Sequence, residues 1–210
     1  MAGKTIRLHH LFIVVLLLNA IQPGWASADR GQALFRLCAT CHGHQGEGRQ
    51  DVGAPAIAGL PEWYVTAQLQ KFRQGVRGSH PQDSAGMRMR PMARTLPTED
   101  DVQSVAAYVA RLPSPMPPQA VSGDVANGAT QYLVCMACHG PDGKGNQPLM
   151  APPLTVANDW YLLKQLRNFQ NGLRGGDPAR DAAGSMMLSI ARMLDEQGMK
   201  DVIAYIQTLR

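Results

Sequence analysis

Apolar residues recur at helical spacing in three segments of the first half of the chain. The first segment, residues 30–41, places its stripe at positions i, i+3, i+4 and i+7, which are Leu34, Leu37, Cys38 and Cys41. The second segment, residues 62–75, ends at a glycine suited to a helix C-cap and carries a face made of Tyr64, Leu69 and Phe72. Both segments are therefore predicted to be helices.

The third segment, residues 98–112, begins with Thr98, a favourable N-cap that is followed by acidic residues in the first turn. Its predicted buried stripe consists of Val102, Val105 and Val109. No segment shows the strict alternation of apolar and polar residues that indicates a strand. The pattern predicts an all-α fold in which small helical bundles carry long loops.

The second half of the chain repeats the first. Cys38 aligns with Cys135 at an offset of 97, and "WYVTAQLQKFRQGVRG" (63–78) aligns with "WYLLKQLRNFQNGLRG" (160–175) at the same offset. The predicted domains are therefore residues 29–112 and 124–210. Between them, residues 113–123 hold four prolines, which favour a semi-rigid extended linker.

Residues 1–28 are predicted to be an export signal. A positive flank with Lys4 and Arg7 precedes the apolar run 11–21 and a small-residue A-x-A site at 26–28. The mature protein is expected to start near Asp29 and to be located in the periplasm, with an uncleaved membrane anchor as the alternative. Removing the two cations lowers the formal charge from +4 to +2, so no nucleic-acid partner is indicated.

All 4 cysteines lie in two C-x-x-C-H motifs, which are typical of covalent haem c attachment. Each thiol would form a thioether with the haem, and the histidine would be the proximal iron ligand. The predicted attachment residues are Cys38 and Cys41 with His42, and Cys135 and Cys138 with His139. A thioredoxin-like redox pair, a shared zinc site and structural disulfides are the alternatives.

Methionine is the candidate for the second axial position, because the second repeat has no histidine apart from His139. "DSAG" and "ARTL" in the first repeat match "DAAG" and "ARML" in the second at an offset of 98. At that offset, Met89 and Met187 are the methionines that coincide, and they are the predicted distal ligands. The rival ligands are Met87, Met92, Met186 and, in the first domain, His80.

Two further residue pairs have expected roles. Pro55 and Pro152 follow the motifs at similar distances and suit a loop whose backbone carbonyl accepts the histidine Nδ1–H. Arg77 and Arg174 are candidates for pairing with haem propionates, and solvated surface charge is the alternative.

The chain resembles the cytochrome c4 family of exported dihaem proteins with two class I cytochrome c domains. The resemblance rests on "CATCHG" and "CMACHG", on "APAIAGL" before residues 63–78, and on "MRPMARTL" before the last helix of the first repeat. In that family the methionine opening the last motif is the distal ligand, which corresponds to Met89 and Met187. The second repeat departs from the pattern at "PPLTV" (152–156) and Ile190.

The predicted function is electron transfer by a carrier with two covalently bound haem c groups and no substrate site of its own. The resemblance implies redox protein partners: a quinol-oxidising complex or dehydrogenase as donor and a terminal oxidase as acceptor. Association with a membrane surface is expected only through such partners. The alternative functions are a cytochrome subunit of a periplasmic dehydrogenase complex and, less favoured, a dihaem peroxidase.

Overall fold

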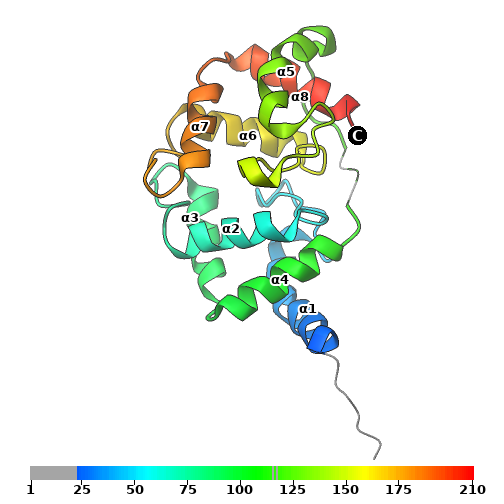
Figure 1. Ribbon diagram of the computed structural model, residues 1–210, viewed down its shortest axis with the longest axis vertical. Helices are drawn as coiled ribbons and strands as arrows, with labels where there is room; N and C mark the ends of the chain where they lie inside the picture. The colour runs from blue at the N-terminus through cyan, green and yellow to red at the C-terminus, as the bar shows by residue number, and fades with distance from the viewer. Residues whose placement is uncertain (1–22, 115, 117) are drawn as a thin grey trace, which may run out of the picture.

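The computed structural model describes residues 23–114, 116 and 118–210, and Figure 1 shows two helical halves stacked on one another. The elements are α1 (Pro23–His42), α2 (Glu62–Arg73), α3 (Ser84–Arg94), α4 (Glu99–Arg111), α5 (Val125–His139), the 3-10 helix η1 (Gln147–Leu149), α6 (Asp159–Gln170), α7 (Ala182–Ala191) and α8 (Glu196–Thr208). The described residues form two isolated bridges but no strand. The predicted all-α class is confirmed.

Both halves use the same helix packing. In the first half α1 packs on α4, and α2 packs against α3 and α4; in the second half α5 packs on α8, and α6 packs against α7 and α8. A glycine allows the helices to approach closely in the α1–α4 contact and in the α5–α8 contact. A Cβ added to Gly31 would clash with the Ser104 carbonyl, and one added to Gly128 would clash with the Asp201 carbonyl.

The core of each half is aliphatic and aromatic. The predicted valine stripe of α4 is fully buried and packs with residues from α1 and α2, including Phe35, Leu69 and Phe72. The second core combines α5, α6 and α8 through Tyr132, Leu163, Met199, Val202, Ile203 and Ile206. In both halves a tyrosine of the last helix contacts an aromatic ring of the first helix. The ring centroids are 5.2 Å apart in Phe35–Tyr108 and in Tyr132–Tyr205.

The apolar stripe predicted for residues 30–41 is only partly buried, because Leu34 and Cys38 pack against the core cluster but the other two residues do not. Leu37 exposes 46% of its surface and Cys41 is also exposed, whereas Phe35 and Ala39 are buried. The buried side of α1 is therefore centred on Phe35 and Ala39 and includes one edge of the predicted stripe. Cys38 is partly buried at that edge, whereas Cys41 is exposed.

Capping explains where several helices begin. Thr98 caps α4 as predicted. Its hydroxyl oxygen accepts from the Asp101 amide, and the Asp101 carboxylate accepts from the Thr98 amide. The spacing of apolar residues did not predict two of the helices, α3 and α7. Each begins after an aspartate whose carboxylate accepts an amide three residues later, Asp83 from Gly86 and Asp181 from Gly184.

The two halves meet through α2 and α6, which run side by side in the middle of Figure 1. The Ala56 amide donates to Asn158 Oδ1 at 2.6 Å, and Lys71 Nζ pairs with Asp181 Oδ1 at 2.6 Å. The later part of the linker is held on the second half, because Asp159 accepts the amides of residues 120 and 121. These contacts join the two domains directly and hold the end of the linker in place.

The predicted export signal lies outside the described residues up to position 22, and α1 is continuous from Pro23. None of the described helices has the length and apolar character needed to cross a membrane.

Candidate functional site

Each C-x-x-C-H motif occupies the last turn of a helix. α1 ends at His42 and α5 ends at His139, so each pair of thiols lies one helical turn apart. All four thiols are free in the structure. Burial raises the pKa of both Cys38 and Cys135 to about 11, so these groups stay protonated at neutral pH. A thioredoxin-like pair requires the opposite shift, which disfavours that alternative.

Both histidines are buried and held by a backbone carbonyl. His42 Nδ1 lies 2.7 Å from the Pro55 oxygen, and His139 Nδ1 lies 2.8 Å from the Pro152 oxygen. The expected proline contact is therefore confirmed in both repeats. Because a carbonyl can only accept, Nδ1 carries the proton and Nε2 is left free to bind a metal. Burial lowers the pKa of both imidazoles, which favours the neutral form that a metal requires.

The loop after each histidine returns to it through a glycine. The Gly48 amide donates to the His42 carbonyl at 2.7 Å, and the Gly145 amide donates to the His139 carbonyl at 2.9 Å. Both glycines have a φ of 84°, which side chains rarely tolerate. The tight return places the proline carbonyl beside the imidazole.

The structure places the predicted distal methionines on matching helices, Met89 on α3 and Met187 on α7. Met89 is partly buried and packs against the same core cluster as Cys38. The rivals Met87 and Met186 expose 41% and 59% of their surfaces. His80 forms a local loop contact in which its Nδ1 accepts the Gln82 amide. The assignment of Met89 and Met187 as iron ligands stays a prediction.

Arg77 and Arg174 form a ring with two glutamines between the domains. Arg77 donates to Gln68 at 2.9 Å and Gln165 at 3.0 Å, and Arg174 donates to Gln165 at 2.9 Å and Gln68 at 3.1 Å. Each guanidinium also stacks on an aromatic ring, at 4.7 Å over Phe72 and 4.5 Å over Phe169. Arg77 is 7% exposed, so the surface-charge alternative is wrong for it.

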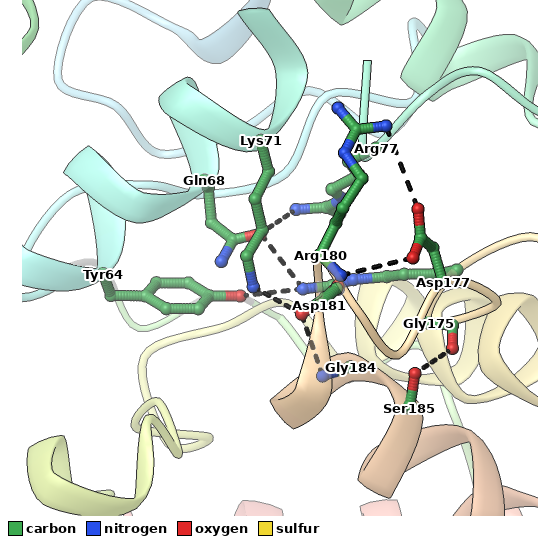
Figure 2. A network of polar contacts seen from close by, with 11 residues as sticks. Tyr64, Gln68, Lys71, Arg77, Gly175, Asp177, Arg180, Asp181, Gly184 and Ser185 are labelled. Carbon is green, nitrogen blue, oxygen red and sulfur yellow. Dashed lines mark hydrogen bonds and ion pairs between the residues drawn. The ribbon is translucent and has the colours of Figure 1, made fainter. Parts of the chain in front are cut away.

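Figure 2 shows Lys71, Arg77 and Arg180 near this ring, with the carboxylates of Asp177 and Asp181 beside them. The ring acceptors are neutral, and Asp181 pairs with Lys71. Burial opposes ionisation of Arg77, but the contact with Tyr161 and the charge of Asp83 contribute to a raised pKa of its guanidinium. Burial opposes ionisation of Tyr64, but Arg174 and Arg77 outweigh it and lower the pKa of that phenol. Arg174 Nε is buried without a hydrogen-bond partner among the described residues. The interface therefore suits an added anion, and a haem carries two carboxylates.

Sequence reasoning missed the domain interface. Tyr161 accepts from Arg77 at 2.7 Å, and Asn158 receives the Ala56 amide, yet neither residue stands out in the sequence. The available signal was the repetition of Tyr, Gln and Arg at equal spacing in both copies. A repeated polar residue on an otherwise apolar helix face indicates a shared buried contact.

A helical bundle with a carbonyl-held C-x-x-C-H histidine defines a c-type cytochrome, and this chain contains two. The family model for cytochrome c matches residues 28–113 and 125–210. Cytochrome c4 of Azotobacter vinelandii is 30% identical over 94% of this chain and 98% of its own. The chain therefore belongs to the cytochrome c4 family and binds two haem c groups covalently.

Two further proteins are similar to this chain over most of its length. The thiosulfate dehydrogenase electron acceptor of Stutzerimonas stutzeri is 32% identical, covering 91% of this chain and 90% of its own. The crystal structure of reduced recombinant cytochrome c4 from Pseudomonas stutzeri superposes with a TM-score of 0.68 at 27% identity, covering 87% of this chain and 98% of that chain. Both relatives are similar over nearly the full length, so the chain is a dihaem electron carrier of this type.

Proposed function

We propose that this dihaem cytochrome carries electrons between respiratory-chain proteins in the periplasm and delivers them to a terminal oxidase. The observation that carries the proposal is the duplication of a complete site. Each repeat has its own carbonyl-held histidine and its own candidate methionine, on α3 in the first repeat and on α7 in the second. Two such sites allow one molecule to hold two electrons.

In each domain the two cysteines would hold the haem covalently, and the histidine and methionine would complete the iron coordination. The first site uses Cys38, Cys41, His42 and Met89, and the second uses Cys135, Cys138, His139 and Met187. The bound group supplies reversible one-electron chemistry, and methionine ligation favours a high reduction potential. The protein fixes the Nδ1 tautomer of each histidine and excludes water from it by burial.

We assign Arg77 and Arg174 to the haem propionates. The two guanidiniums are oriented by neutral amides and aromatic faces, and neither forms a direct ion pair among the described residues. The Asp83 carboxylate offsets part of the charge of Arg77. Bringing like charges together in a partly buried interface is unfavourable unless an anion is present. The carboxylates of haem would provide that anion, and burial of both domains against each other would then be stabilised.

The proposal is tested by stopped-flow oxidation of the reduced holoprotein with oxidase-containing membranes from its own source. Absorbance follows both haems at two salt concentrations. We expect rapid oxidation of both haems, and membranes treated with an oxidase inhibitor provide the control. Negligible oxidation of an intact protein would reject the assignment to a terminal oxidase.

A second candidate function is the electron acceptor of a periplasmic dehydrogenase. It is favoured by the similarity to the thiosulfate dehydrogenase electron acceptor. In this case the oxidised protein would be reduced rapidly by its dehydrogenase and substrate, and it would co-purify with the catalytic subunit. Thiosulfate with a matching dehydrogenase is the first pair to assay.

A further inference from the structure

The two repeats carry different charges at equivalent positions around their attachment loops. Arg88, which precedes Met89, corresponds to Met186 at an offset of 98. Arg49 corresponds to Asn146, and Lys164 of α6 corresponds to Ala67 of α2, both at an offset of 97. Each of the three cations thus has a neutral counterpart in the other repeat.

These three cations gather around one loop of the first domain, residues 50–53. Arg88 Nη2 donates to the Val52 carbonyl at 2.9 Å. A Cβ added to Gly53 would lie 3.5 Å from Arg88 Nη2 and 3.9 Å from Lys164 Nζ, so the two cationic heads flank that residue. Arg49 Nη1 lies 3.4 Å from the carbonyl of Thr40, which is between the two cysteines.

We call Arg49, Asp51, Arg88 and Lys164 the basic edge. Arg49 pairs with Asp51 at 2.5 Å, so three cations and one carboxylate leave a net charge of +2. Within the part of the chain that the structure describes, neither Arg88 nor Lys164 forms an ion pair. The equivalent positions are Asn146, Pro148 and Met186 in the second repeat and Ala67 in the first, and none of these residues carries a charge.

The fold does not require these charges. The second domain builds the same helices, the same histidine–carbonyl contact and the same loop bridge with Asn146, Pro148 and Met186 in place of Arg49, Asp51 and Arg88. In the same way, α2 forms with Ala67 at the position that Lys164 occupies in α6. The basic edge also reaches from the helix bearing Met89 to the loop behind His42 and to the cysteine segment. A protein bound on this edge would therefore lie beside the first haem.

We propose that the basic edge docks a redox protein with an acidic surface, so that the first haem exchanges electrons with a partner selected by charge. The inference rests on the proposed carrier function. A net charge of +2 with no internal carboxylate to balance it attracts an acidic surface and accelerates encounter at low salt. The equivalent surface beside the second haem is neutral and does not attract an acidic protein in this way. The two haems therefore face partners of different chemistry.

The experiment exchanges the two edges and measures binding of poly-glutamate, which stands for an acidic protein surface. One variant carries Arg88→Met and Lys164→Ala, which replaces each cation with the neutral residue at the equivalent position of the other repeat. The reciprocal variant carries Met186→Arg and Ala67→Lys. A control with Arg111→Met and Lys200→Ala removes two exposed cations elsewhere. Calorimetry on the oxidised holoproteins gives the affinity at low and high salt.

We expect the first variant to bind poly-glutamate about tenfold more weakly than the natural protein at low salt, because it lacks two cations. The reciprocal variant should bind more tightly, the control should change less than about threefold, and high salt should remove the differences. Equal weakening in the first variant and the control would overturn the proposal. Edge-dependent binding to vesicles with anionic lipid, without binding to poly-glutamate, would also overturn it in favour of a membrane surface.

This binding assay involves no electron transfer. A failure of the carrier function would appear in the oxidase assay while leaving the binding result unchanged. Stopped-flow oxidation by hexacyanoferrate(III), an anionic oxidant, then links the edge to the haem. The first variant should show a weaker dependence of rate on ionic strength than the control, and equal dependence would contradict docking beside the first haem.

Discussion

Lys71 and Asp181 form an ion pair between the two domains that is largely shielded from solvent. Lys71 Nζ lies 2.6 Å from Asp181 Oδ1, and the two side chains expose 19% and 5% of their surfaces. Lys71→Met keeps most of the side-chain volume but removes the charge. Asp181 would then be a buried carboxylate whose remaining bond is to the Gly184 amide.

These contacts bound the loss of unfolding free energy expected for Lys71→Met. Removing one partner of a buried ion pair costs about 3–5 kcal/mol. The bond from Gly184 and the partial exposure of Lys71 reduce this figure, so we expect Lys71→Met to lower the free energy of unfolding by about 2–3 kcal/mol. Lys200→Met breaks an exposed pair with Glu196 at 3.6 Å and should cost at most about 1 kcal/mol.

Urea unfolding of the holoprotein, followed by far-ultraviolet circular dichroism, measures both variants. A double-mutant cycle with Asp181→Asn isolates the pair, because asparagine can still cap α7. We expect a coupling energy of about 1.5 kcal/mol or more between Lys71 and Asp181. A coupling below about 0.5 kcal/mol, or a Lys71→Met loss no larger than that of Lys200→Met, would refute the claim that this pair joins the domains.

Three further variants test the second haem site, the domain interface and the contact between α1 and α4. Met187→Ala should lower the reduction potential of one haem and leave both haems covalently attached, as measured by redox titration and intact mass. Tyr64→Phe should remove a phenol that ionises below its ordinary pKa, so ultraviolet titration of the natural protein should show one more tyrosine ionising below about pH 10 than the variant does. The hydroxyl of Thr98 and the guanidinium of Arg30 lower the pKa of Asp101, so its stabilisation is complete above about pH 4 and is lost as pH falls through the lowered value. Asp101→Asn should therefore flatten the dependence of unfolding free energy on pH below about pH 4, as measured by urea unfolding at a series of pH values.

Patterns that act locally were readable from the sequence. The C-x-x-C-H spacing fixes both thiols on one turn ahead of the histidine, and the valine spacing of residues 102–109 fixes the buried side of α4. Thr98 was predicted as a cap because its hydroxyl and the following acids act within one turn. The repeat extended these local predictions to the second domain and predicted the proline carbonyl contact in both.

Features that depend on tertiary contact were not readable. Leu37 lies on an apolar stripe but is exposed, because the core contacts Phe35 and Ala39 on another face of the helix. The ring of Arg77, Gln68, Arg174 and Gln165 needs two domains to be placed against each other, and spacing within one helix does not encode this. The helix α3 was missed because Pro91 and Gly86 weaken its propensity, while the cap at Asp83 starts it.

The central claim is that both irons have two protein ligands and act only in electron exchange. An equilibrium redox titration of the purified holoprotein, with and without carbon monoxide, tests it most directly. We expect two one-electron transitions whose reduced spectra are unchanged by carbon monoxide, because methionine fills the position that the gas would occupy. A haem that binds carbon monoxide in the native protein would contradict the claim and indicate an open iron site.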